Sequence, residues 1–196
     1  DKIIADKYKE VALRKQLIPV KQLEQSVLFE RKSPSLAQAL SASTSGIIAE
    51  HKRRSPSKAT INNNLNVQDV ASGYEQAGVC GMSVLTDGKY FGGSLDDLLL
   101  ARAAAQLPLL RKEFVIDTYQ ILEAKAYGAD VILLIAAVLT REEIKTLSEF
   151  AKSLGLDVLL EVHNLEELQK SVMPSLDMLG VNNRNLKTFE VSLETS

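Results

Sequence analysis

An acid and a base lie two residues apart within residues 46–57 of the sequence. The stretch begins with strand-forming apolar residues and changes into charge at Glu50. Because side chains alternate between the two faces of a strand, Glu50 and Lys52 point the same way. Residues 55–57, Ser-Pro-Ser, end the strand, since proline has no N–H for the ladder. The pattern predicts an acid–base pair at a strand end, although residues 51–54 alone would also fit a solvated basic loop or a nuclear-import-like cluster.

Other polar residues fall at or near the ends of further apolar runs. They are Asp87, Lys112, Glu161, Asn182 and Arg184. Lys112 lies between Arg111 and Glu113 in an expected strand, where charged side chains are costly to bury without partners. Parallel α/β folds build their sites at the carboxyl ends of the strands. We therefore expect these residues to gather with Glu50 and Lys52 at one end of a parallel sheet.

The elements that must position these residues alternate between strand and helix. After the strand that opens residues 46–57, we expect strands at 79–85, 107–114, 131–138, 157–162 and 175–181. Capping-box patterns at Asp117 and Thr140 open two of the intervening helices, and Gly78, Gly128 and Gly155 stand at helix-stop positions. Helical patterns at 1–17, 20–29 and 35–40 precede the first strand. The sequence therefore predicts an α/β fold with helices outside a parallel sheet.

Right-handed crossovers leave a barrel or a doubly wound open sheet. An open sheet concentrates its site at one switch point, whereas a barrel brings every strand end to one mouth. The polar residues come from most of the expected strands, and no glycine-rich dinucleotide fingerprint is present, so we favour a TIM (βα)8-type barrel. We expect residues 1–45 to form a helical extension, which either packs on the barrel or caps its mouth. Residues 46–196 are expected to supply βα units one to six.

Composition narrows the classes of partner. The 196 residues carry a formal net charge of −2, which does not favour a nucleic-acid partner. A single cysteine, Cys80, excludes an intramolecular disulfide framework and suits a reducing cytoplasm. No apolar run approaches the roughly 18 residues of a membrane span, and residues 1–7 lack the apolar core of a secretory signal. We expect a cytoplasmic protein without a membrane or nucleic-acid partner.

Six stretches in order resemble the indole-3-glycerol phosphate synthase family. They are residues 47–57, 87–94, 109–114, 128–135, 160–163 and 180–186. The resemblance covers nearly the whole chain and includes the helical extension. It implies a (βα)8 barrel with extra amino-terminal helices. It also implies a lyase of tryptophan biosynthesis, which converts 1-(2-carboxyphenylamino)-1-deoxyribulose 5-phosphate to indole-3-glycerol phosphate with loss of carbon dioxide and water.

The resemblance implies a role for each matching residue. Lys112 resembles the general acid of ring closure, and Glu161 resembles the general base of the later dehydration. Glu50 resembles the partner carboxylate of Glu161. Lys52 resembles a residue that pairs with substrate anions, and whether it shares the acid role stays open.

The resemblance also implies a binding site for the substrate. Asn182 and Arg184 resemble substrate-orienting groups, since a guanidinium suits a carboxylate, and Ser55 resembles a contact on the anthranilate side. The remaining residues resemble walls of an aromatic pocket: Phe91, Phe114, Leu133 and Leu186. No metal or organic cofactor is implied, because the iminium formed on ring closure can accept electrons during decarboxylation.

Some residues receive no chemistry from the resemblance. We expect His51 and His163 to be structural or to lie at the edge of the site, and Cys80 to be a small core residue. Asp87 and Lys89 could either be solvated or reach the substrate.

The sequence departs from the family by supplying six of eight strands. Strands seven and eight, which carry the phosphate site in such barrels, are absent, so we expect a chain truncated after strand six. An inactive fragment that needs a carboxyl-terminal piece is therefore an alternative function. Strands one and six would expose edges that allow association, whereas the full-length protein is expected to be a monomer or weak oligomer. Another metal-free phosphate-binding barrel, phosphoribosylanthranilate isomerase, is a further alternative, but Cys80 opens its strand and lies at the wrong end for that enzyme's Cys/Asp pair.

Overall fold

The computed structural model, which describes residues 2–62, 64–184 and 191–196, contains a curled sheet of six parallel strands. Their spatial order follows the sequence, and each pairs in parallel with the next. The strands are β1 (Ile48–His51), β2 (Gly81–Leu85), β3 (Leu109–Lys112), β4 (Val131–Ile135), β5 (Asp157–Val162) and β6 (Met178–Val181). In a doubly wound sheet the order of the strands reverses at a switch point. The sequential order seen here therefore confirms the barrel-type prediction.

The expected strands are confirmed, but several are shorter than the apolar runs. β5 has the predicted bounds, whereas β3 ends at Lys112 instead of residue 114. β4 stops at Ile135, where a turn begins, and β6 starts at Met178 instead of residue 175. Burial continues past the ends of β3 and β4, which is why hydrophobicity alone overestimates their lengths.

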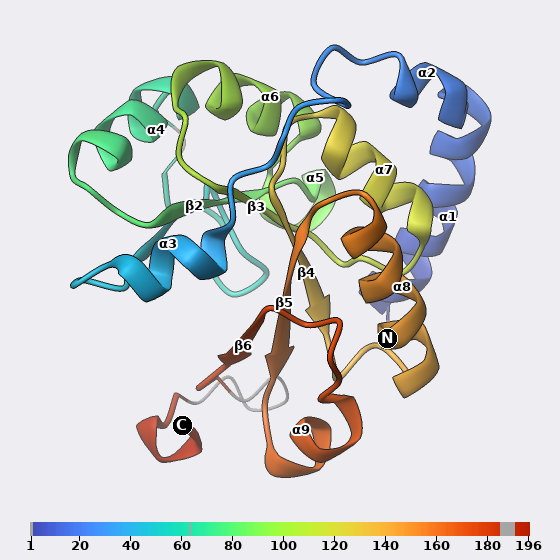
Figure 1. Ribbon diagram of the computed structural model, residues 1–196, viewed down its shortest axis with the longest axis vertical. Helices are drawn as coiled ribbons and strands as arrows, with labels where there is room; N and C mark the ends of the chain where they lie inside the picture. The colour runs from blue at the N-terminus through green and yellow to red at the C-terminus, as the bar shows by residue number, and fades with distance from the viewer. Residues whose placement is uncertain (1, 63, 185–190) are drawn as a thin grey trace.

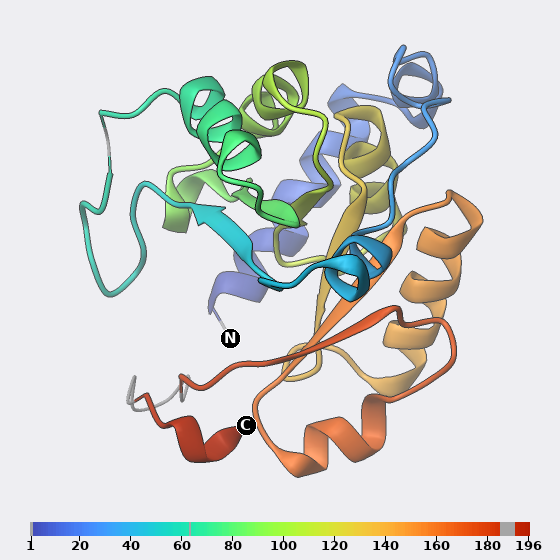
Figure 2. The same ribbon diagram turned by 60° about the vertical axis from the view of Figure 1, so that its left-hand side comes forward.

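Helices cover the outside of the sheet. Along the chain they are α4 (Val67–Gln76), the short α5 (Gly88–Phe91), α6 (Leu95–Ala104), α7 (Thr118–Ala126), α8 (Arg141–Ser153) and α9 (Leu165–Ser171). The ribbon views show α4, α6, α7 and α8 in succession around the strands (Figures 1 and 2). The predicted capping boxes at Asp117 and Thr140 are both formed, with Gln120 and Glu143 as the third helical residues.

The two faces of the sheet have separate cores. Ile132 and Leu134 of β4 belong to the larger outer core beneath the helices. Leu133 and Ile135 alternate with them and belong to a smaller inner core, together with Leu110 of β3. This alternation follows from the period of two in a strand, and it assigns every strand residue to an outer or an inner face.

Helix α3 (Leu36–Ala42) fills the inner face at the amino ends of the strands. Leu36 is fully buried in the inner core, and Ser35 Oγ donates a 2.7 Å hydrogen bond to Asp157 Oδ2 at the start of β5. Gly81 leaves room for this helix, because a Cβ there would lie 2.6 Å from Leu36 Cδ1 and 3.0 Å from the Pro108 carbonyl oxygen. The third helix of the extension therefore covers the amino-terminal end of the inner core.

Helices α1 (Lys2–Leu17) and α2 (Val20–Glu24) pack against the outside of α7. Val11 and Leu23 are buried with Tyr119 and Ala126 in a third apolar cluster. The Tyr119 hydroxyl lies 2.9 Å from the Ile18 carbonyl oxygen, to which it donates a hydrogen bond. The first two helices are thus joined to the barrel through one helix of its outer layer.

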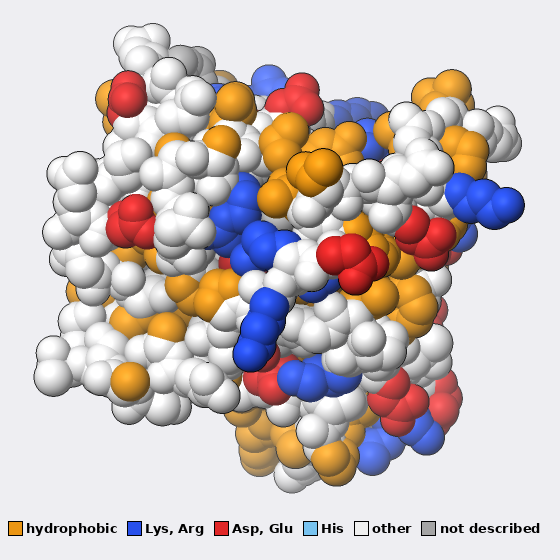
Figure 3. Space-filling view, turned by 45° about the horizontal axis from the view of Figure 1, so that its top comes forward, with side chains coloured by type: hydrophobic (Ala, Val, Ile, Leu, Met, Phe, Trp, Pro, Cys, Tyr) orange, Lys and Arg blue, Asp and Glu red, His pale blue; other side chains and the backbone are white. Residues whose placement is uncertain are grey.

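The surface view in Figure 3 mixes basic, acidic and apolar side chains, with a group of basic side chains near its centre. Within the described ranges, no helix is long and apolar enough to cross a membrane.

Candidate active site

Glu50 is the centre of a charged cluster on the inner face. Its Oε1 lies 2.8 Å from Lys52 Nζ, and its Oε2 lies 3.3 Å from Lys112 Nζ. The first contact confirms that the two residues predicted at 46–57 point the same way. The second joins β1 to β3 across β2. One carboxylate thus holds two ammonium groups, and each of the three side chains remains about one-third exposed.

Ser83 supports this cluster from β2, and sequence reasoning missed it. Ser83 is the register partner of Glu50, and its hydroxyl donates a 3.2 Å hydrogen bond to Glu50 Oε2. Burial alone would raise the pKa of Glu50, but Lys112 and Lys52 outweigh it and lower that pKa below its usual range. Ser83 lies inside an apolar strand with no charge beside it, so only the strand register identifies it.

Glu161 lies on the same face, farther along the sheet. Lys112 is two residues after Leu110, and Glu161 is two residues after Leu159; both leucines pack in the inner core. The alternation of strand side chains therefore directs Lys112 and Glu161 to the same face. Strand β4 separates them, with Ile135 as the register partner of Glu161.

One hydrogen bond holds the Glu161 carboxylate, and a histidine ring lies beside it. Asn182, just after β6, donates a 3.1 Å hydrogen bond through Nδ2 to Glu161 Oε1. His163 Nε2 lies 3.5 Å from the same oxygen, while its Nδ1 lies 3.2 Å from Glu167 Oε2. The predicted Glu161 and Asn182 are thus in contact, and His163 lies at the edge of the site.

The two aromatic residues expected in the site form a pair near the Lys112 end of the cluster. The ring centroids of Phe91 and Phe114 lie 6.2 Å apart with a tilt of 40°. Phe114 packs against the inner core that contains Leu133. Leu133 itself is only 1% exposed, so it forms the floor of this region rather than an open wall.

The remaining predicted residues lie in loops. Ser55 occupies a turn in which its N–H donates to the Lys58 carbonyl oxygen at 2.9 Å. The Arg184 N–H donates to Asn182 Oδ1 at 3.0 Å, and the Arg184 side chain is exposed. Leu186 lies outside the described residues. The structure thus places Arg184 next to Asn182, and it places Ser55 in the loop that follows β1.

The basic residues after Lys52 anchor the β1–α4 loop. Arg53 pairs with Asp97 of α6 through its Nη1 and Nη2 atoms, and Arg54 Nη2 donates a 2.7 Å hydrogen bond to the Gly88 carbonyl oxygen. Arg53 is partly buried and Arg54 is exposed. These contacts correct the alternative of a purely solvated basic loop, because both residues join the loop to the segment after β2.

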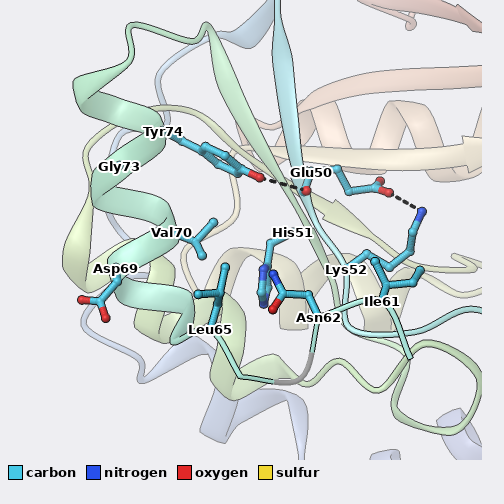
Figure 4. Close-up of a pocket in the computed structure, with 10 residues that line it drawn as sticks. All are labelled: Glu50, His51, Lys52, Ile61, Asn62, Leu65, Asp69, Val70, Gly73 and Tyr74. Atoms are coloured by element: carbon cyan, nitrogen blue, oxygen red, sulfur yellow. Dashed lines mark hydrogen bonds and ion pairs between the residues drawn. The ribbon is translucent and has the colours of Figure 1, made fainter. Parts of the chain in front are cut away.

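His51 points to the outer face, away from the charged cluster. Figure 4 shows its ring beside Asn62 and Leu65, while the Glu50 carboxylate and the Lys52 ammonium approach each other on the other side. A cavity of about 610 Å³ lies here between β1, α4 and the side chains of Ile61, Asn62 and Leu65. Burial lowers the pKa of His51, and the nearby Arg53 lowers it further. Of the inner-face cluster, only Glu50 and Lys52 also line this cavity. We therefore place the candidate chemistry on the inner face.

Asp87 does not belong to the inner-face cluster. It is buried, caps α5 by accepting from the Tyr90 N–H, and pairs with Lys7 of α1 at 2.9 Å. Lys89 pairs with Asp6 at the surface. Cys80 is buried at the amino end of β2, as expected of a core residue. In the part of the chain that the structure describes, no three His, Cys, Asp or Glu side chains are grouped to hold a metal ion.

Comparisons with known proteins all indicate one family. The profile of the indole-3-glycerol phosphate synthase family matches residues 1–196. An indole-3-glycerol phosphate synthase of Bacteroides thetaiotaomicron is 48% identical over 99% of this chain and 74% of its own length. One of Bordetella pertussis is 42% identical over 100% of this chain and 76% of its own length. The chain thus spans about three quarters of these relatives.

Similarity to solved structures supports the fold alone. The crystal structure of a methylornithine synthase superposes with a TM-score of 0.50 and 14% sequence identity, covering 84% of this chain and 64% of that one. The family profile and the relatives, together with an acid–base cluster on the inner face of a parallel barrel-type sheet, lead to one assignment. This chain belongs to the indole-3-glycerol phosphate synthase family.

Proposed function

We propose that the inner-face cluster performs the reaction of the family. That reaction closes the indole ring of 1-(2-carboxyphenylamino)-1-deoxyribulose 5-phosphate, with loss of carbon dioxide and water, in tryptophan biosynthesis. The observation that carries the proposal is the Glu50 carboxylate, which is 2.8 Å from the Lys52 ammonium and 3.3 Å from the Lys112 ammonium. A proton donor and a carboxylate base held together on one face can serve both the condensation and the elimination.

Lys112 is proposed as the general acid of ring closure. It protonates the ketone oxygen of the substrate while the anthranilate ring attacks the carbonyl carbon. Its side chain is about one-third exposed, so a ligand can reach it, and its ammonium group lies 3.3 Å from Glu50 Oε2. Lys52 lies on the other oxygen of Glu50 and is proposed to pair with anionic groups of the substrate.

Glu161 is proposed as the general base of the dehydration, with Glu50 as its partner carboxylate. The amide of Asn182 orients Glu161 Oε1, which leaves Oε2 for the proton that the elimination releases. Arg184 is proposed to contact the substrate carboxylate before decarboxylation, because a guanidinium binds a carboxylate through two parallel hydrogen bonds.

The proposed ligand is a phosphorylated small molecule with an aromatic ring. Phe91 and Phe114 form the aromatic wall, and Leu133 is its apolar floor. Ser55 and Leu186 are proposed to complete the anthranilate side. We place the protein in the cytoplasm, with residues 1–45 as the helical extension and 46–196 as the barrel units.

Two variants test the assigned roles by separating carbon dioxide release from indole formation. Lys112→Met removes the acid of the first step, so both signals are expected to fall at least about 100-fold. Glu161→Gln removes only the later base, so carbon dioxide is still released in the first turnover while indole absorbance is lost. Radiolabelled carbon dioxide and ultraviolet absorbance measure the two steps in a single-turnover experiment.

The controls are Lys145→Met and Glu149→Gln, which make the same chemical changes at exposed positions of α8. They are expected to retain the wild-type rates. Normal indole formation by Glu161→Gln, or by Lys112→Met, contradicts the role assigned to that residue.

A further inference from the structure

Lys7 of α1 is a buried cation that the proposed reaction does not use. Its side chain is 2% exposed, and its Nζ lies 2.8 Å from Glu10 Oε2, 2.9 Å from Asp87 Oδ2 and 3.0 Å from Glu113 Oε1. Asp87 and Glu113 are themselves almost fully buried. Burial alone would lower the pKa of Lys7, but Glu113, Glu10 and Asp87 outweigh it and raise that pKa above its usual range.

Both buried partners of Lys7 directly adjoin residues of the proposed site. Glu113 follows Lys112 in the sequence, and its Oε1, the oxygen that Lys7 contacts, accepts a 2.9 Å hydrogen bond from the Phe114 N–H. Asp87 accepts from the N–H of Tyr90, the residue before Phe91. The Lys7 ammonium therefore joins the segment after β3 to the segment after β2, and these segments carry Phe114 and Phe91 of the proposed aromatic wall.

Glu113 has further buried contacts at this junction, including Arg111 Nη2 at 3.8 Å from its Oε2. Its Oε2 accepts a 2.9 Å hydrogen bond from Thr86 Oγ1. Thr86 in turn accepts a 3.1 Å hydrogen bond from Arg111 Nε, on the outer face of β3. Breaking a buried ion pair by removing one partner leaves uncompensated charge, which is relieved by uptake of a proton or by movement of these segments.

We propose that Lys7 is a positioning residue for the reaction, which holds Lys112 and the Phe91–Phe114 pair in place through Glu113 and Asp87. The helical extension is on this view part of the active-site framework as well as an outer packing layer. The inference rests on the proposed function, because the residues that Lys7 positions are those assigned to the acid and the aromatic wall.

The test compares Lys7→Met with Lys15→Met. Lys15 belongs to the same helix and makes a 2.6 Å ion pair with Asp117, but both side chains of that pair are substantially exposed. At a temperature where all variants are folded, Lys7→Met is expected to lower kcat by about tenfold or more, because small displacements of reacting groups are costly. Lys15→Met is expected to stay within about twofold of wild type, as for an exposed ion pair. Lys7→Arg retains the charge and is expected to recover most of kcat.

A purely structural role would lower the unfolding temperature of Lys7→Met while leaving kcat and KM of the folded protein unchanged, and that result overturns the proposal. If Lys7→Met does not fold, Glu113→Gln keeps the side-chain volume and weakens the same junction. It is then expected to lower kcat, and an unchanged kcat in Glu113→Gln also overturns the proposal.

A second readout separates this inference from the proposed function. The NMR signal of the Lys112 side-chain ammonium, which reports its contact with Glu50, is expected to shift in Lys7→Met and not in Lys15→Met. If the wild-type chain shows no turnover, the proposed function fails while this signal still decides the positioning role. An unshifted Lys112 signal in Lys7→Met contradicts that role.

Discussion

At the scale of single residues, Glu50 is the group on which the positions of its neighbours in the site depend. Two ammonium groups and one hydroxyl contact its carboxylate, and they come from β1, β2 and β3 or the residues directly after them. Its ionisation therefore affects the position of both proposed cationic groups. The lowered pKa of Glu50 means that the carboxylate stays charged at neutral pH.

The pH dependence of stability follows from that lowered pKa. Because the pKa of Glu50 is lower in the folded than in the unfolded chain, its contribution is fully present above the unfolded value of about 4.3. That contribution is lost as the pH falls through the folded value. Glu50→Gln is expected to cost on the order of 1 kcal/mol of unfolding free energy at pH 7. The difference from wild type should narrow as the pH is lowered below about 4.

Urea unfolding of wild type and Glu50→Gln at a series of pH values measures this difference. Glu149→Gln, at an exposed position of α8, serves as the control for the loss of one negative charge. A wild-type advantage over Glu50→Gln that does not change with pH would show that ionisation of Glu50 is not its source.

At the scale of elements, α3 is the helix of the extension that packs on the inner face of the sheet. Leu36 is fully buried among inner-face residues of β3 and β4. The side chain of Asp157 accepts hydrogen bonds from Ser35 Oγ and from the Ala37 N–H, which fixes the start of the helix to β5. The helix therefore contributes to the stability of the strands that carry the site.

Leu36→Ala should remove about 3 kcal/mol of unfolding free energy, because it opens a cavity in a closely packed core. Leu13→Ala, at a position of α1 that is 56% exposed, makes the same chemical change and should cost less than about 1 kcal/mol. Denaturant unfolding monitored by circular dichroism compares the two variants. Equal losses would mean that α3 is not part of the cooperative core.

Much of this element-level arrangement could be predicted from the sequence. The apolar runs and the capping residues indicate all six strands, and the period of two places Glu50 with Lys52. The ends of β3 and β4 and the start of β6 could not be predicted, since burial and strand hydrogen bonding do not stop at the same residues. The contacts of Lys7 with Asp87 and Glu113 could not be predicted either, because they join residues 80 to 106 positions apart, and no local pattern reports such a pair.

At the scale of the whole molecule, the sheet has two edges. Among the described strands, β1 and β6 each pair with one neighbour. Leu179 and Val181 of β6 are 47% and 43% exposed, and Ile47 beside β1 is 52% exposed. Unpaired backbone groups beside exposed apolar side chains favour pairing with another chain. We therefore propose that the chain associates through these edges.

Light scattering coupled to gel filtration checks this proposal across a range of protein concentrations. The apparent mass of the chain is expected to rise with concentration. Val181→Lys places a charge on the exposed edge strand and should shift the chain toward monomer. Leu193→Lys, at a residue that is 79% exposed and lies outside the sheet, is the matched control. A monomer at all concentrations would contradict association through the edges.

Because side chains alternate between the two faces of β3, an insertion or deletion of one residue there would move its charged side chains to the opposite faces. Arg111 faces outward, where it donates to the Gln120 carbonyl oxygen and pairs with Glu123 of α7, while Lys112 faces inward to Glu50. A slip of one residue would place the Arg111 guanidinium on the inner face beside the proposed site and the Lys112 ammonium under α7. Because these two neighbouring cations have partners on opposite faces of the sheet, a register shift would break contacts on both faces at once. The register of β3 is therefore fixed by charge as well as by hydrophobicity.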